Sequence, residues 1–253
     1  MELSIFYGLM GVMALIACVV FVALFYIKAG YGLFYSGKWG WAISNKLAWV
    51  CMETPVFIVM LWLWYNSERR FEWVPLLFFL LFELHYFQRS FIFPFLMKGK
   101  SKMPVSIMTM GIVFNLINGF IQGEWIFYLS PSTMYTPEWL SSLPFLTGTI
   151  VFFCGMIINI HSDYVIRNLR KPGDTRHYLP QKGMYRYVTS ANYFGECLEW
   201  IGFAILTWSW SGALFALWTF ANLAPRAAAI HQSYRKEFGE KVGKRKRLIP
   251  FVW

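Results

Sequence analysis

The chain has 253 residues, of which 57% are hydrophobic and only 14% are charged, and its mean hydropathy is +0.45. Soluble domains carry about 25% charged residues, so this composition excludes an ordinary soluble domain and indicates an integral membrane protein. The net charge of +10 could point to nucleic acid, but the cations are concentrated beside apolar segments, as in the cytoplasmic loops of membrane proteins. We therefore expect contact with membrane lipids and no nucleic-acid partner.

Seven apolar runs are long enough to cross a bilayer, which takes about 20 helical residues. The sequence thus predicts an all-α, polytopic membrane protein with seven transmembrane helices, built as a single domain over residues 1–253. The predicted spans are 5–27, 42–65, 72–97, 103–129, 138–160, 191–208 and 210–232.

Lysine and arginine in the loops predict the orientation, because cytoplasmic loops carry an excess of them. If the N-terminus is outside, the outer loops hold only Arg69 and Arg70, and all the other loop cations lie inside. We therefore expect the C-terminus in the cytoplasm, in either a bacterial inner membrane or the endoplasmic reticulum membrane. A loop at about 161–190 and a basic C-terminal tail at 233–253 then face the cytoplasm, where soluble nucleotide cofactors are found.

Two polar side chains are predicted at the same depth in neighbouring helices. Glu53 and Tyr86 each lie about 11 residues from the inner end of their span, or about 16 Å at 1.5 Å per residue. A carboxyl group at this depth favours its protonated form, and together with a phenol it could donate two hydrogen bonds to a carbonyl oxygen, as in an oxyanion hole. The alternative is that the two side chains bond to each other or to backbone freed by Pro55.

The longest polar interval lies between the fifth and sixth predicted spans, and polar residues spaced for one helix face flank it. Its six cations are Arg167, Arg170, Lys171, Arg176, Lys182 and Arg186. The flanking residues are Asn159 and Asp163, Asn192 and Glu196, and, in the last span, Arg226 and Tyr234. Amides and carboxylates suit nucleotide hydroxyls and carboxamides, and arginines suit phosphates; the alternative is a polar network that only joins helices.

Two other kinds of site are excluded by pattern. No G-x-G-x-x-G follows a strand, which excludes a Rossmann nucleotide site. The four cysteines lie in apolar runs without metal-ligand spacing, so we expect no metal site.

Three long motifs resemble those of the steroid 5α-reductase (3-oxo-5α-steroid 4-dehydrogenase) family: NIHSDYVIRNLRKPG from Asn159, ANYFGECLEWIG from Ala191 and PRAAAIHQSYRKEFGE from Pro225, with RKRLIPFVW after the last of them. Shorter stretches upstream, WVCMETP from Trp49 and HYFQRSF from His85, are similar to that family as well.

The resemblance implies an NADPH-dependent reductase that saturates the 4,5 double bond of a 3-oxo-Δ4 steroid, or of another lipophilic enone that enters from the bilayer. It implies that Glu53 and Tyr86 hold the 3-keto oxygen during hydride transfer to C5. The positions that match cofactor contacts are Tyr31, Lys100, Asn159, Asp163, Arg170, Asn192, Glu196, Arg226 and Tyr234. Substrate contacts are expected from Glu53 and Tyr86 and from the apolar walls Trp49, Phe114 and Trp200, in a protein expected to be a monomer.

The chain departs from the family pattern near both sites. Lys100 stands where an arginine is usual, and Ile230 stands where a histidine can be found. Met52 replaces a glutamine, Met97 an asparagine, and Met110 an arginine that helps shape the steroid pocket. The preferred steroid therefore does not follow from the resemblance.

Other functions remain open from the sequence alone. A related membrane sterol or enoyl reductase, or an isoprenylcysteine-type methyltransferase that uses S-adenosylmethionine, would have similar C-terminal polar helices. Cofactor charge separates them, since cationic S-adenosylmethionine needs no cluster of cations. A transporter is a third class, but inverted repeats and broken helices are not evident.

Overall fold

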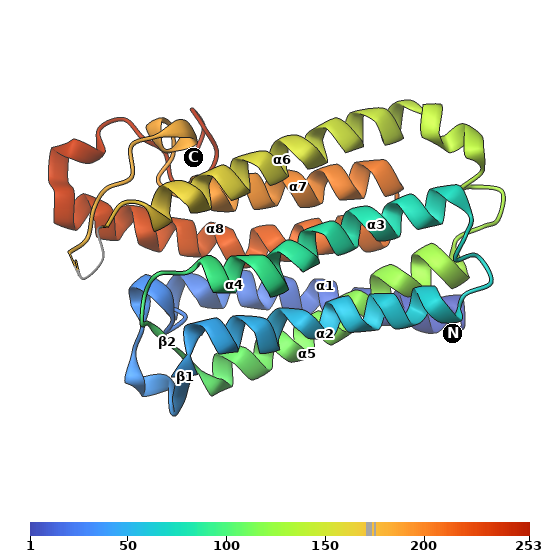
Figure 1. Cartoon of the computed structure of the whole chain (residues 1–253), viewed down its shortest axis with the longest axis horizontal. Helices are drawn as coiled ribbons and strands as arrows, with labels where there is room; N and C mark the ends of the chain where they lie inside the picture. The colour runs from blue at the N-terminus through green and yellow to red at the C-terminus, as the bar shows by residue number, and fades with distance from the viewer. Residues whose placement is uncertain (171–173, 175) are drawn as a thin grey trace. The chain divides into compact units, whose positions relative to one another are not determined.

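A long apolar segment in a bilayer must satisfy its own backbone hydrogen bonds, and an α-helix does so within one segment. The computed structural model describes residues 1–170, 174 and 176–253, and long helices make up most of the described chain (Figure 1). Lys171, one of the six predicted loop cations, lies outside the described residues.

Seven long helices are present among the described residues, as the sequence predicts. They are α1 (Leu3–Tyr26), α2 (Asn45–Asn66), α3 (Trp73–Phe87) with its continuation α4 (Phe93–Leu96), α5 (Val105–Glu124), α6 (Leu143–Arg167), α7 (Ala191–Thr207) and α8 (Trp210–Phe238). A π-helical turn, Gln88–Ile92, joins α3 to α4, and a second, Trp125–Leu129, ends α5. Short 3₁₀ turns are found at Gly32–Phe34, Gly37–Trp39, Pro137–Ser141, Gly183–Arg186 and Gly239–Val242.

Within the described residues, six helical segments are long and apolar enough to cross a membrane, and the chain is a multi-pass membrane protein. The exception is α7, which has 17 residues and falls short of the roughly 20 that a bilayer crossing takes. The predicted seventh span therefore stays a prediction, as does the orientation. The fifth span was predicted to end at Ile160, where polar residues begin, but α6 continues to Arg167. The loop that follows is correspondingly shorter than the predicted 161–190.

The contacts divide the described chain into two compact units. The first comprises Met1–Val12 and Ala29–Leu146. The second comprises Met13–Lys28 and Thr147–Trp253.

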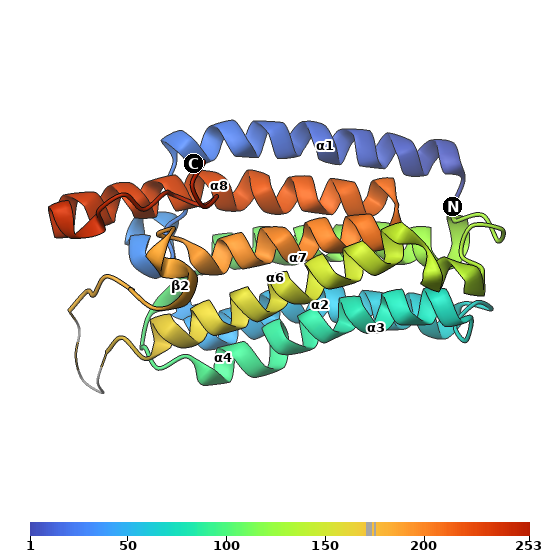
Figure 2. The same cartoon turned by 90° about the horizontal axis from the view of Figure 1, so that it is seen from above.

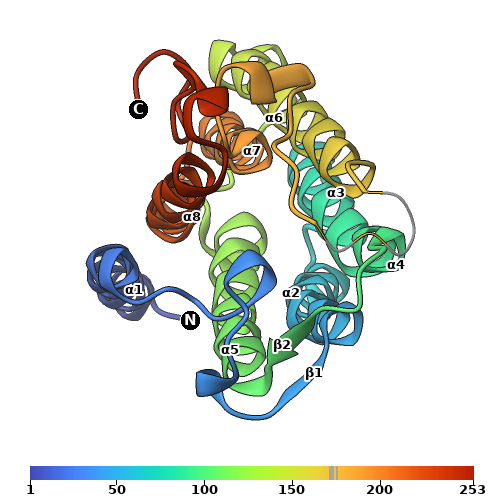
Figure 3. The same ribbon diagram turned by 90° about the vertical axis from the view of Figure 1, so that its left-hand side faces the viewer.

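The first unit is built on the packing of α2 against α5, which lie side by side in the end-on view of Figure 3. Gly119 lets α5 approach closely, since a Cβ there would lie 3.1 Å from a side-chain carbon and the carbonyl oxygen of Val56. A two-stranded antiparallel ribbon, β1 (Ala42–Ser44) with β2 (Lys102–Pro104), joins the segments that lead into the two helices.

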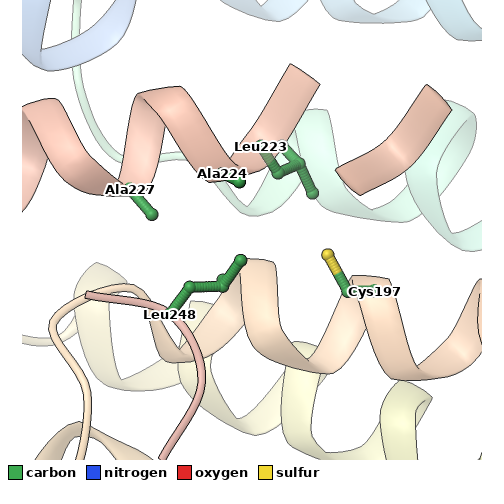
Figure 4. Close-up of a cluster of buried hydrophobic side chains, with 5 residues drawn as sticks. All are labelled: Cys197, Leu223, Ala224, Ala227 and Leu248. Atoms are coloured by element: carbon green, nitrogen blue, oxygen red, sulfur yellow. The ribbon is translucent and has the colours of Figure 1, made fainter. Parts of the chain in front are cut away.

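The second unit is built on α6, α7 and α8, which run alongside one another in Figure 2. The connection between α7 and α8 is two residues long: Trp208 adopts a left-handed conformation with φ 47°, and the Ser209 side chain caps α8 by accepting from the Gly212 N–H at 3.0 Å. A buried cluster joins α7 and α8 to the C-terminal segment, and its members are Cys197, Leu223, Ala224, Ala227 and Leu248 (Figure 4).

Candidate functional site

In the first unit, the predicted acid and phenol are both hydrogen-bonded to the same helix. Glu53 lies on α2 and Tyr86 lies on α3, where Tyr86 is 2% exposed. The Asn115 amide donates from Nδ2 to Oε2 of Glu53 at 3.2 Å, and the Asn118 amide donates from Nδ2 to the Tyr86 hydroxyl at 3.3 Å. Because these asparagines are three residues apart on α5, they share a helix face, and the acid and the phenol are bonded to positions about one turn apart on that helix.

Sequence reasoning assigned no role to three α5 amides, although their spacing gives a recognisable pattern. Asn115, Asn118 and Gln122 are three and four residues apart, and each is at most 5% exposed. Gln122 donates from Nε2 to the Asn118 side-chain oxygen at 3.4 Å. Polar residues at helical spacing inside an apolar span are costly unless they have partners, and that spacing is what could have revealed them.

A buried guanidinium lies close to the phenol in sequence. Arg89 is 8% exposed and lies in the π-helical turn, three residues after Tyr86. Its guanidinium carbon is 4.7 Å from the ring centre of Trp49 and 4.6 Å from that of Phe93, so the cation contacts two aromatic rings at once. Trp49 precedes Glu53 by four residues, so the predicted wall residue Trp49 and the predicted acid share a face of α2.

In the second unit, the structure brings four of the predicted cofactor residues into one network. Asn159 donates from Nδ2 to the backbone carbonyl of Asn192 at 3.0 Å and to Oε2 of Glu196 at 3.5 Å. Asn192 in turn donates from its own Nδ2 to Oδ1 of Asp163 at 3.2 Å. These contacts join the end of α6 to the start of α7, and they explain why α6 stays helical through the polar residues after Ile160.

Tyr185, which the sequence did not single out, is at the centre of this network. It is 1% exposed in the 3₁₀ turn Gly183–Arg186, and its hydroxyl donates to Oδ1 of Asn192 at 3.3 Å. Burial raises the pKa of the Tyr185 phenol well above its ordinary value, and the neighbouring Asp163 and Tyr234 raise it further. The phenol is therefore neutral and is a donor at physiological pH.

Four of the five remaining predicted cofactor residues have varied surroundings. Arg226 on α8 donates from Nε to the Tyr193 hydroxyl at 2.7 Å. Arg170 is exposed after the end of α6. Tyr31 and Lys100 belong to the first unit, where Tyr31 packs against a cluster containing Met103 and Lys100 is exposed.

Within the loop, one predicted cation is already paired. Asp174 accepts from the backbone N–H, Nε and Nη2 of Arg176 and, at 2.6 Å, from the Tyr178 hydroxyl. The Arg176 guanidinium is the main reason that the pKa of the Asp174 carboxyl is held below its ordinary value. Part of the hydrogen-bonding capacity of Arg176 is thus used within its own loop.

Two residues predicted to line a substrate cavity, Phe114 and Trp200, lie on α5 and α7. Phe114 is partly buried on α5, directly before Asn115. Trp200 is 1% exposed on α7 in the second unit, where its ring centre is 4.2 Å from that of Phe215 and 6.5 Å from that of Phe152.

Comparison with known proteins identifies the family. Residues 101–253 match the family described as 3-oxo-5-alpha-steroid 4-dehydrogenase. The chain is 39% identical to human (Homo sapiens) 3-oxo-5-alpha-steroid 4-dehydrogenase 1 over 240 residues, which cover 94% of this chain and 92% of that protein. The chain belongs to the steroid 5α-reductase family. A plant relative, steroid 5-alpha-reductase DET2 of Arabidopsis thaliana, is 36% identical over 92% of this chain and 90% of its own length.

Membership of the steroid 5α-reductase family makes the chain an oxidoreductase and implies NADPH as its reductant. The methyltransferase and transporter alternatives are therefore set aside. The second unit has groups that fit a dinucleotide: amides and carboxylates at the facing ends of α6 and α7, and a cation on α8. In addition, the hydroxyls of Ser162 and Ser190, each 1% exposed, have no hydrogen-bond partner within the described part of the chain. Such buried hydroxyls need a polar ligand or water.

Proposed function

We propose that this steroid 5α-reductase reduces the 4,5 double bond of a 3-oxo-Δ4 steroid to give the 5α-reduced 3-oxo steroid, with Glu53 and Tyr86 as the groups that bind the 3-keto oxygen. The observation that carries the proposal is the pair of hydrogen bonds from α5, which bind an acid and a phenol from two different helices at positions about one turn apart on α5. Two donors bound to neighbouring turns of one helix suit an oxygen atom that accepts two hydrogen bonds.

The two donors act where charge develops in the reaction. Addition of a hydride at C5 moves the electrons of the double bond toward C3, so the 3-keto oxygen becomes enolate-like before C4 takes up a proton from solvent. Protonated Glu53 and the Tyr86 hydroxyl each donate a hydrogen bond to that oxygen, and both bonds strengthen as its negative charge grows. Donors that are fixed in place before the reaction stabilise the transition state more than the ground state.

NADPH, when bound, supplies the hydride. Asn159, Asp163, Asn192 and Glu196 are proposed to bind its polar groups, with Tyr234 beside them. Arg170 and Arg226 are proposed to contact phosphates, and Tyr31 and Lys100 complete the proposed set. The interhelical network in the second unit supports this assignment, because its amides and carboxylates already hold the ends of α6 and α7 together around the buried Tyr185.

The substrate is proposed to enter from the bilayer, with Trp49, Phe114 and Trp200 as apolar walls of its cavity. The proposed topology has the N-terminus outside and the cofactor end in the cytoplasm, and the protein is proposed to act as a monomer. Met52 and Met110 are the departures from the family pattern that bear on steroid choice.

The test is a steady-state assay of the purified protein with NADPH and progesterone or testosterone, following loss of the enone absorbance. We expect Tyr86→Phe to lower kcat by about 100- to 1,000-fold, the usual cost of removing one oxyanion-hole donor, and Glu53→Gln to lower kcat as well, because an amide N–H is a weaker donor than a carboxyl O–H. Binding of NADPH, measured by thermal stabilisation, should be preserved in both variants.

Matched controls are available on exposed positions of the same unit and on α1. Glu72→Gln changes a half-exposed carboxylate before α3, and Tyr26→Phe changes an exposed phenol at the end of α1. Both should retain the wild-type rate. Wild-type turnover in Glu53→Gln and Tyr86→Phe would defeat the proposal.

A further inference from the structure

Three buried amides on α5 form hydrogen bonds in which the donor and the acceptor are defined. Asn115 and Asn118 are each 5% exposed and Gln122 is 1% exposed, in a helix that is otherwise apolar enough to cross a membrane. A buried amide in such a helix lowers stability unless its hydrogen-bonding groups have partners. The partners of Asn115 and Asn118 include the two proposed catalytic groups, Glu53 and Tyr86.

The orientation of the Asn118 amide is set by its neighbour on the next turn. Gln122 donates to the side-chain oxygen of Asn118 at 3.4 Å, which turns the NH₂ group of Asn118 toward Tyr86. That NH₂ group donates to the Tyr86 oxygen at 3.3 Å. A phenol oxygen that accepts from an amide must direct its own proton to a different acceptor. The chain from Gln122 through Asn118 therefore determines which way Tyr86 donates.

Asn115 performs the same task for the acid. Its NH₂ group uses one hydrogen on the backbone carbonyl of Met52 at 2.7 Å and the other on Oε2 of Glu53 at 3.2 Å. A protonated carboxyl group has one oxygen that only accepts and one that carries the proton. Since Oε2 accepts from Asn115, the proton belongs on Oε1. The bond to Met52 anchors the amide to the turn of α2 that bears Glu53.

We propose that Asn115 and Asn118 are positioning residues that aim the protons of Glu53 and Tyr86 at one substrate oxygen, with Gln122 orienting Asn118. This inference rests on the proposed function, since it assumes that the acid and the phenol bind the 3-keto oxygen. It also assigns the α5 amides a role in kcat beyond holding α2, α3 and α5 together.

The decisive variant is Asn118→Asp, which keeps the size of the side chain and replaces the donating NH₂ group with an accepting oxygen. The Tyr86 hydroxyl then donates to the introduced carboxylate at pH values above the pKa of that group, which burial raises, and in this range it is diverted from the substrate. We expect kcat to fall about 10- to 100-fold, the usual effect of losing a supporting hydrogen bond behind a functional group. KM for the steroid should change less than kcat, and thermal stabilisation by NADPH should be retained.

Two further readouts separate positioning from a purely structural role. The activity of Asn118→Asp should recover as the pH falls, because a protonated carboxyl group regains a donor, whereas the wild-type profile lacks this rise. In a Tyr86→Phe background, Asn118→Asp should cause no more than about a twofold further loss, because a residue that acts through Tyr86 has nothing left to orient. The equivalent cycle pairs Asn115→Asp with Glu53→Gln.

A control variant and an alternative variant test whether the effect is specific to the α5 amides. Asn66→Asp changes an exposed amide at the end of α2 that bonds to the Trp62 carbonyl, and it should leave kcat unchanged. If Asn118→Asp does not fold, Gln122→Met serves instead; it should lower kcat several-fold, and this loss should vanish in the Tyr86→Phe background. Additive losses in the cycles, or no pH recovery, would overturn the positioning role while Tyr86→Phe and Glu53→Gln stay inactive. Wild-type rates in those two single variants would instead overturn the proposed function.

Discussion

At the scale of single residues, the second unit depends on a neutral phenol. Tyr185 is buried beside the network of Asn159, Asp163 and Asn192. Burial together with the Asp163 carboxylate raises the pKa of its phenol. An unfolded tyrosine ionises near pH 10. The raised value therefore stabilises the folded state fully below about pH 10, and this contribution is lost as the pH rises further toward the folded pKa.

We expect the melting temperature of the wild-type protein in detergent to fall more steeply between about pH 9.5 and 11.5 than that of Tyr185→Phe. At neutral pH the variant should be less stable by about 1 kcal/mol, because the bond to Asn192 is lost. Tyr26→Phe, which changes an exposed phenol, should keep the wild-type slope. Parallel curves for the wild type and Tyr185→Phe would contradict this account.

Arg89 supports a second residue-scale prediction. Its planar guanidinium contacts the rings of both Trp49 and Phe93, an arrangement that a compact lysine ammonium does not reproduce. We expect Arg89→Lys to lower the free energy of unfolding by about 1–2 kcal/mol, which thermal unfolding would detect. Arg70→Lys is the matched control: its guanidinium lies 5.3 Å from the Phe71 ring at the surface and should cost about 0.5 kcal/mol or less. Equal effects of the two substitutions would refute the prediction.

The sequence could predict those site residues that are unusual within their own segment, but not those whose role depends on partners far away in the chain. Glu53 and Tyr86 stand out because an ionisable or polar group deep in an apolar span is unusual. Asn115 and Asn118 were missed because the role of a buried amide depends on the side chain to which it donates. Their partners on α2 and α3 lie 62 and 32 residues away in the chain. Tyr185 was missed for the same reason, since nothing in a loop tyrosine indicates that it is buried.

At the scale of elements, the contact of α6 with α7 is a backbone-to-backbone approach. A Cβ atom at Gly155 would meet the backbone nitrogen of Glu199 and the carbonyl oxygen of Gly195. A Cβ atom at Gly202 would meet the backbone of Phe152 in the same way. Small residues at such crossings let helices pack closely in membranes. This close packing also brings Asn159 within hydrogen-bonding distance of α7.

Gly155→Ala should therefore force the two helices apart. We expect a loss of about 1–3 kcal/mol in unfolding free energy, as for other overpacked cores, together with weaker stabilisation by NADPH. Gly11→Ala is the control, because a Cβ there meets nothing within 4 Å; it should be neutral or stabilising by up to about 1 kcal/mol. Thermal unfolding with and without NADPH measures both effects, and wild-type behaviour of Gly155→Ala would rule out the close approach.

Hydropathy predicted which segments are helices but not where α6 ends. The predicted end at Ile160 followed from the polar residues His161, Ser162 and Asp163. The helix continues because Asp163 gains a donor, Asn192, from α7. Such a partner comes from the packing of one helix on another, and a count of apolar residues along one segment does not reveal it.

At the scale of the whole molecule, the chain passes between its two units three times: within α1 after Val12, after Lys28, and within α6 after Leu146. The proposed topology places the loop 130–137 outside and the C-terminal segment in the cytoplasm. In a variant whose native cysteines are replaced, Ser132→Cys should react with a membrane-impermeant maleimide in intact cells. Glu240→Cys should react only after permeabilisation. The reverse pattern would invert the topology.

The C-terminal segment has a consequence for how the protein is made. Lys246 bonds through its backbone to Tyr187 and Thr189, at 2.8 and 2.9 Å, and Leu248 is buried against Ala224 and Ala227. The segment 244–253, which holds the turn before α7, is thus translated after all seven long helices. A nascent chain can insert its helices and fold its acid–phenol pair before this segment is available. We therefore expect competence for the proposed nucleotide only once this segment has been translated, so a chain truncated after α8 should insert into the membrane but lack reductase activity.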